Sequence, residues 1–94
     1  MAVPDTIPVD TSDEDALIRR HVDPNPDGRG RDEACLIDSG TPVWALIAYL
    51  SVAKGDAARV AHDYDVPLDA VLAALAYYRR NRKLIDARLL LNEA

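Results

Sequence analysis

The second half of the chain repeats one hydrophobic pattern three times. In each repeat the apolar residues fall at positions i, i+3, i+4 and i+7, which is the spacing of one face of an α-helix. The three sets are Val43, Leu46, Ile47 and Leu50; Ala57, Val60, Ala61 and Tyr64; and Leu68, Val71, Leu72 and Leu75. The pattern predicts three helices, at about 42–53, 56–64 and 67–80, joined by turns of a few residues.

A fourth apolar segment follows, and its pattern is less one-sided. Leu84, Ala87 and Leu91 share one helical face, Ile85 and Leu89 share a neighbouring one, and Leu90 widens the apolar surface. We therefore predict a C-terminal helix at about 82–92. Because so small a domain offers little surface of its own to cover such a helix, we expect it to be buried against another chain.

The first 40 residues lack this regularity. Turn-forming residues are concentrated at 23–30, where the sequence reads Asp-Pro-Asn-Pro-Asp-Gly-Arg-Gly, so no regular element should cross that segment. A short helix is expected over 13–21, and a short strand or helical turn around 34–37. We predict an acidic, partly flexible and poorly structured N-terminal arm over residues 1–40, followed by a helical domain over residues 41–94.

Charge is unevenly distributed along the 94 residues, whose formal net charge is −5. Residues 1–40 hold ten acidic residues against four arginines, whereas five bases lie close together in the C-terminal quarter, at Arg79, Arg80, Arg82, Lys83 and Arg88. This asymmetry indicates two separate functions or an N-terminal segment that covers the basic one, with ordinary solvated surface as the alternative. No apolar run is long enough to span a membrane and no signal-peptide pattern is present, so we expect a cytoplasmic protein without membrane association.

Residues 57–76 have the spacing of a helix-turn-helix motif. Asp65 occupies the turn position, where an aspartate tolerates the left-handed backbone, and Val66 is expected to fill the core below the turn. Base recognition requires Arg, Lys, Asn, Gln or Ser near the start of the second helix, but that helix presents Leu68, Asp69 and alanines. We therefore interpret the motif as a packing or dimer-forming unit, with DNA binding as the alternative. The expected fold class is all-α: a three-helix, homeodomain-like bundle with a C-terminal helix.

Several segments together resemble a known family. They are Gly40–Thr41–Pro42–Val43–Trp44, Asp63–Tyr64, Val71–Leu72–Ala73–Ala74–Leu75–Ala76–Tyr77–Tyr78 and Asn81–Arg82–Lys83–Leu84–Ile85–Asp86. The sequence from about Val22 to Asn92 is similar to the prokaryotic domain-of-unknown-function family 433. This resemblance implies a homeodomain-like, often dimeric fold and a gene beside that of a small PIN-like nuclease, and hence an antitoxin role. The turn-rich segment 23–31 and the acidic leader depart from the family's usual pattern.

The C-terminal helix carries the candidate partner site. The resemblance implies a PIN-type nuclease partner that holds metal in a cluster of carboxylates, and guanidinium or ammonium groups pair well with carboxylates. A helix that combines such groups with leucines is suited to lie in an apolar groove. The candidate partner-binding residues are Arg82, Lys83, Leu84, Ile85, Arg88, Leu89 and Leu91, and the candidate contacts to DNA or phosphate are Arg79, Arg80, Arg29 and Arg31.

The sequence contains no recognisable catalytic constellation. His21, His62 and Cys35 lack partners at a useful spacing, and Gly28 and Gly30 lack the setting of a phosphate-binding loop. We therefore expect no enzymatic activity, no metal and no cofactor. The sequence favours an antitoxin-like homodimer that neutralises a PIN-like nuclease. The alternatives are a helix-turn-helix regulator that binds operator DNA and a structural oligomerisation module.

Overall fold

The computed structural model describes residues 11–93, and most of this stretch is helical. Its α-helices are α1 (Thr11–His21), α2 (Val43–Val52), α3 (Ala57–Tyr64), α4 (Leu68–Arg80) and α5 (Arg82–Glu93). Two short strands, β1 (Val22–Asp23) and β2 (Cys35–Leu36), pair antiparallel, with Val22 opposite Leu36. Between the strands lie two single turns of 3₁₀ helix, η2 (Pro26–Gly28) and η3 (Arg31–Glu33). The mostly helical class is as predicted, with a small strand pair in addition.

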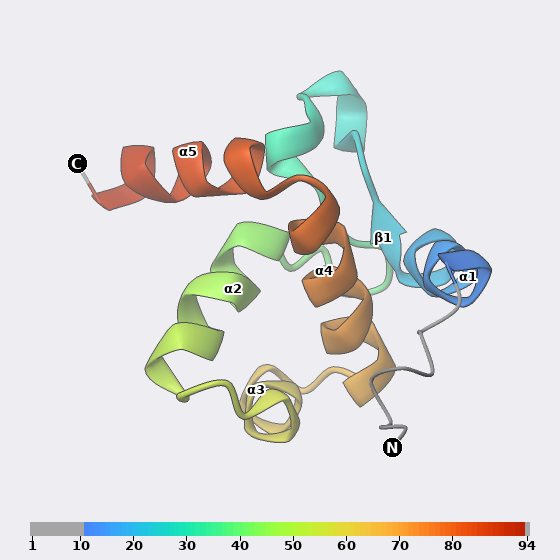
Figure 1. Ribbon diagram of the computed structural model, residues 1–94, viewed down its shortest axis with the longest axis vertical. Helices are drawn as coiled ribbons and strands as arrows, with labels where there is room; N and C mark the ends of the chain where they lie inside the picture. The colour runs from blue at the N-terminus through green and yellow to red at the C-terminus, as the bar shows by residue number, and fades with distance from the viewer. Residues whose placement is uncertain (1–10, 94) are drawn as a thin grey trace, which may run out of the picture.

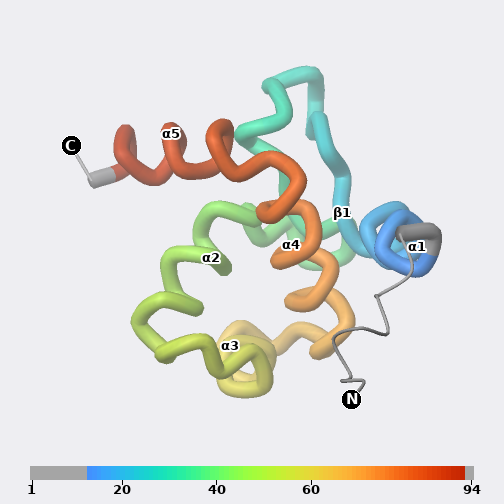
Figure 2. Tube along the Cα trace, in the orientation of Figure 1, coloured from blue at the N-terminus to red at the C-terminus, as the bar shows by residue number. Residues whose placement is uncertain are grey.

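Helix α4 is the centre of the fold. Figures 1 and 2 show α1 on one side of it and α2 and α3 on the other, and β1 and α5 also contact it. Its buried residues are mostly small: Ala70, Ala73, Ala74 and Ala76 are at most 4% exposed, together with Val71. Because alanines let neighbouring backbones approach closely, one helix can serve as the packing surface for several others.

The helices after Gly40 begin and end within one residue of the predicted bounds. The Asp56 carboxylate caps α3 by accepting a hydrogen bond from the Arg59 backbone N–H at 3.1 Å. Asp65 ends α3 in the left-handed conformation predicted for the turn (φ 56°, ψ 49°), and the Val66 N–H donates to the Ala61 carbonyl at 3.0 Å. Val66 packs against the core, as expected.

Within residues 11–40 the predicted short helix over 13–21 is present as α1, and the short strand or helical turn expected around 34–37 is present as the strand β2. The segment is nevertheless more ordered than the poorly structured arm that we expected, because it packs on the core; residues 1–10 lie outside the described part. Leu17 and Ile18 of α1 are partly buried against the core. Val22, Ala34 and Leu36 are at most 3% exposed. These apolar residues follow no regular period in the sequence, but burial against α4 is favourable enough to order the segment around them.

A single buried hydroxyl ties the loop between the strands to α4. The Tyr77 hydroxyl donates to the Arg31 carbonyl at 2.9 Å, and Tyr77 is only 5% exposed. Burial raises the pKa of this phenol above its ordinary value, with a smaller opposing effect from the positive charge of Arg31. None of the helices in the described part of the chain is long and apolar enough to cross a membrane.

Candidate functional site

Contacts at the α4–α5 junction set the direction of α5. The backbone of Asn81 (φ −130°, ψ 37°) interrupts the helix, and its side-chain amide donates to the Tyr77 carbonyl at 3.0 Å. The Tyr78 hydroxyl donates to Asp86 Oδ1 at 2.8 Å, and the Arg82 guanidinium lies 5.1 Å from the centre of the Tyr78 ring. As a result α5 turns away from α4 and runs out over α2, as Figure 1 shows.

The inner face of α5 belongs to the core of this chain. Ile85 is 0% exposed, and Leu89 packs against the same hydrophobic cluster. The Arg88 Nε donates to Glu33 Oε2 at 2.8 Å, and its guanidinium lies 4.6 Å from the centre of the Trp44 ring. The prediction that Ile85, Arg88 and Leu89 are partner contacts is therefore corrected, because these side chains already have partners within the chain.

The outer face of α5 is uncovered. Leu84 is 41% exposed, Leu90 is 66% exposed and Leu91 is 70% exposed. Lys83 and Ala87 are exposed on the same helix. Of the predicted partner-binding residues, the structure therefore leaves Arg82, Lys83, Leu84 and Leu91 accessible. Leu90 is also accessible, although the predicted site did not include it. Its exposure depends on which face of the helix packs against the core, and the sequence pattern does not show which face that is.

A second apolar surface lies on α2 and α3. It is a shallow groove of about 260 Å³ lined by Trp44, Ala45, Ala48, Tyr49, Val52 and Tyr64. Val52 is 74% exposed at the end of α2. The Tyr49 and Tyr64 rings meet edge to face at 5.4 Å, and the Tyr49 hydroxyl donates to Asp63 Oδ2 at 2.5 Å. This hydrogen bond links α2 to α3. It is also the main reason that the pKa of Asp63 lies below its ordinary value, and the hydrogen bond from His62 adds to that shift.

Cationic side chains surround a shallow hollow of about 450 Å³ at the α4–α5 junction, which we call the cationic hollow. Its lining residues are Arg31, Arg79, Arg80, Asn81, Arg82, Lys83 and Leu84. Three of the four predicted phosphate contacts thus meet in one place. The fourth, Arg29, does not line the hollow, and its Nε donates to the Pro26 carbonyl at 3.3 Å. Arg31 comes from η3, far from the others in sequence, so the sequence alone does not indicate that it joins them.

Two acidic residues of α1 contact the cationic hollow. Glu14 accepts hydrogen bonds from Arg79 at 3.0 Å and from Arg80 at 3.1 Å, and Asp15 pairs with Arg80 as well. The hydrogen bond from Arg79 is the main reason that the pKa of Glu14 lies below its ordinary value; burial opposes this shift, and Arg80 adds to it. Two of the acidic N-terminal residues therefore pair with two of the five clustered bases.

The second helix of the proposed helix-turn-helix is the central helix α4. Its exposed side includes Leu68, Asp69 and Leu72. Leu72 and Leu75 face α1, where they share a hollow of about 190 Å³ with Leu17. No arginine, lysine, asparagine or glutamine lies in the first ten residues of α4. This surface is therefore unlike the polar surface that reads bases in a DNA groove.

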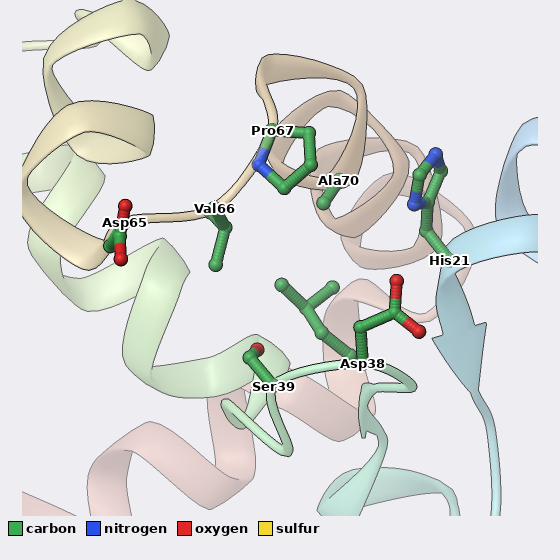
Figure 3. A pocket seen from close by; sticks show the side chains of 8 residues that line it. His21, Asp38, Ser39, Asp65, Val66, Pro67 and Ala70 are labelled. Atoms are coloured by element: carbon green, nitrogen blue, oxygen red, sulfur yellow. The ribbon is translucent and has the colours of Figure 1, made fainter.

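A small cavity lies between the end of α1, the loop after β2 and the α3–α4 turn. It has a volume of about 200 Å³ and is lined by His21, Leu36, Asp38, Ser39, Asp65, Val66, Pro67 and Ala70. Figure 3 shows His21 and Asp38 on one side of it and Val66 and Pro67 on the other. The His21 Nε2 atom is buried and has no hydrogen-bond partner among the described residues. The sequence did not indicate this cavity, because its polar residues come from three separate segments.

The described side chains include no group of three or more His, Cys, Asp or Glu residues placed to hold a metal ion. Cys35 is a free thiol whose pKa is raised, first by burial and then by the negative charge of Asp23. Comparison of this chain with protein-family models, with curated proteins and with solved structures finds no match.

Proposed function

We propose that this chain is an interaction protein of the antitoxin type, which forms a homodimer and neutralises a PIN-like nuclease with the outer face of α5. The observation that carries the proposal is the exposure of Leu84, Leu90 and Leu91 on one helix. Contiguous exposed apolar surface is typical of sites where proteins bind one another. The nuclease class comes from the resemblance to family 433 and not from the geometry.

The chemistry of the outer face suits an apolar groove with acidic residues at its edge. Leu84 and Leu91 are seven residues apart and share one side of the helix, as do the anchors of other helices that bind in grooves, whereas Leu90 lies about 100° further round. Lys83 and Arg82 lie at the N-terminal end of α5, and neither pairs with a carboxylate among the described side chains. These cations are therefore available for the carboxylates of a partner.

The groove on α2 and α3 is the surface that we assign to the second copy of the chain. It is mostly apolar, and Val52, which lines it at the end of α2, is 74% exposed. A homodimer that used this groove would leave the outer face of α5 available to the nuclease. The two interactions therefore require different residues and are separable by substitution.

The test is inhibition of a purified PIN-like nuclease encoded beside the gene for this chain. We expect Leu90→Glu/Leu91→Glu to abolish inhibition of RNA cleavage and to leave the far-UV circular dichroism unchanged, because both side chains are mostly exposed. Ile37→Glu is the matched control, since Ile37 is 52% exposed outside both surfaces. Full inhibition by the double variant would reject the role of the outer face.

A second readout separates dimer formation from inhibition. Val52→Glu should weaken the dimer in sedimentation velocity, whereas Leu90→Glu/Leu91→Glu should leave it intact. Deletion of the residues after Arg80 is a poorer test, because it also removes Ile85 from the core. A Val52→Glu variant that sediments like the unmodified chain would reject the groove as the dimer surface.

DNA binding through the helix-turn-helix is the alternative function, and fewer observations support it. α4 is packed on several sides, and α1 lies along part of its remaining surface. Its first turns also lack base-reading side chains. A promoter duplex that bound with sequence preference, and lost that preference in an Asp69→Ala variant, would favour this alternative over the antitoxin proposal.

A further inference from the structure

We propose that the cationic hollow binds a phosphorylated ligand with at least two adjacent phosphate groups, and that Glu14 and Asp15 cover part of the hollow in the free chain. The proposal does not rest on the antitoxin function, although the hollow shares Arg82, Lys83 and Leu84 with the N-terminal end of the outer face of α5. Leu90 and Leu91 lie near the other end of that helix, so the Leu90→Glu/Leu91→Glu variant and substitutions of Arg31 in the hollow distinguish the two proposals. The proposal also makes no use of the start of α4, where a helix-turn-helix would contact DNA.

The first argument is the balance of charge around the hollow. Five cationic residues line it, and α1 supplies carboxylates to only two of them, Arg79 and Arg80. Arg31, Arg82 and Lys83 pair with no carboxylate among the side chains that the structure describes. Several positive charges held close together favour a ligand with several negative charges, and guanidinium groups match the geometry of phosphate oxygens.

The second argument is the shape of the site. The hollow has a volume of about 450 Å³. Because it is shallow and open to solvent, it suits a ligand that is bound mainly by its charge and not by enclosure. This openness means that a nucleotide polyphosphate and the backbone of an oligonucleotide are both sterically suited to it. Phosphate is the chemistry that these two ligands share.

The net charge of −5 does not prevent anion binding at this place. Exposed charges act over roughly 8 Å at physiological salt, so the nearest groups determine the local potential. Most acidic residues belong to the first 40 positions, whereas the hollow is formed mainly by residues 79–84. Among the described side chains, Glu14 and Asp15 are the acidic groups that pair with its cations.

Glu14 and Asp15 occupy the same guanidinium groups that a phosphate would use. Their ion pairs are partly solvent-exposed, and exposed ion pairs contribute little to stability. Leu17 and Ile18 hold α1 against the core separately from these pairs. A phosphate can therefore displace the two carboxylates without unfolding α1, and they act as a competing internal anion.

The binding test uses two probes, inorganic triphosphate and a short fluorescein-labelled single-stranded oligonucleotide, at about 50 and 200 mM salt. We expect Arg31→Gln/Lys83→Gln to weaken binding roughly tenfold or more. For the single-stranded oligonucleotide, the magnitude of the slope of log K against log salt should fall by about 1.4, at about 0.7 for each of the two charges removed. The matched control, Lys54→Gln/Arg59→Gln, also removes one lysine and one arginine charge. These residues lie near the α2–α3 turn, which Figure 1 shows away from the α4–α5 junction.

The result for the two probes also identifies the source of the phosphate. Binding of triphosphate alone supports a nucleotide-like ligand, and binding of the oligonucleotide supports a nucleic-acid backbone. The proposal is overturned if neither probe binds, or if Arg31→Gln/Lys83→Gln binds as well as its control. The side chains of Arg31 and Lys83 are both exposed, so their substitution should not unfold the protein. Circular dichroism of the double variant checks that its helix content is unchanged.

A separate variant tests the acidic cover. Glu14→Gln/Asp15→Asn should bind the probes several-fold more tightly than the unmodified chain, because it removes the competing carboxylates. Asp38→Asn/Asp69→Asn changes the net charge equally and is the control, since neither aspartate lines the hollow. If the first variant binds no more tightly than the second, Glu14 and Asp15 do not cover the site.

Discussion

Substitution of Ile85 by alanine tests whether α5 is part of the folded body. Ile85 is 0% exposed and belongs to the same hydrophobic cluster as the buried residues of α2 and α4. The change removes three carbon atoms, each worth about 0.8 kcal/mol of transfer free energy. The cavity that remains adds a further cost, so measured Ile→Ala losses in cores reach about 2–5 kcal/mol. We expect the free energy of unfolding to fall by about 3 kcal/mol.

A loss of this size is easy to measure in so small a protein. At about 0.05–0.15 kcal/mol per residue, the whole chain is stable by only about 5–14 kcal/mol. The urea midpoint of Ile85→Ala should therefore fall by about 2–3 M. Its melting temperature should fall by roughly 12–24 °C, at about 4–8 °C per kcal/mol for a domain of this length.

Leu91→Ala is the matched control on the same helix. Leu91 is 70% exposed, so its substitution should change the free energy of unfolding by no more than about 0.5 kcal/mol. Both unfolding curves are followed by far-UV circular dichroism, which reports the helix content. Equal losses in the two variants would mean that α5 is not packed against the core, and would refute the division of α5 into an inner and an outer face.

Three further predictions concern α1, the α3–α4 turn and Tyr77. Tyr77→Phe should cost about 1 kcal/mol in urea unfolding, because it removes the hydrogen bond to the Arg31 carbonyl. Asp65→Ala should cost about 1 kcal/mol because alanine tolerates the left-handed backbone less well, whereas Asp65→Gly should not destabilise the turn. Since its pairing with Arg79 depresses the folded-state pKa of Glu14, stability from this pair is present above the ordinary value of 4.5 and is lost as the pH falls through the depressed pKa. The protection factors of α1 amides, which correct for the slower intrinsic exchange in acid, should therefore fall modestly below about pH 4.5, and Glu14→Gln should remove that acid-dependent step.

The sequence predicts the local structure of the second half well because the information is itself local. Each of α2, α3 and α4 has a complete apolar face within its own residues, and the turn at Asp65 needs only a residue that tolerates a positive φ. In the first 40 residues the sequence predicts α1 and the short strand near 35–36 but not their packing against the core, for the opposite reason. Val22, Ala34 and Leu36 have no common period, and only the surface of α4 explains why they are buried.

The candidate site was predicted in composition but not in orientation. The pattern of α5 shows that the helix is apolar on more than one side, and that its start is basic. It does not show which side faces the core, because the partners of Arg88 are Glu33 and Trp44, which are distant in the sequence. The same holds for Arg31, which reaches the cationic hollow from η3.

The two faces of α5 have a joint consequence for binding. Because Ile85 and the Arg88–Glu33 pair hold the helix to the core, the exposed leucines are presented on a helix that is already formed. A partner then need not supply the conformational entropy of folding that a disordered tail would require. The cationic hollow differs, because Glu14 and Asp15 pair with Arg79 and Arg80 in the free chain and a phosphate has to displace them before it binds. The outer face of α5 is therefore preorganised for its partner, whereas anions of the chain itself oppose binding at the hollow.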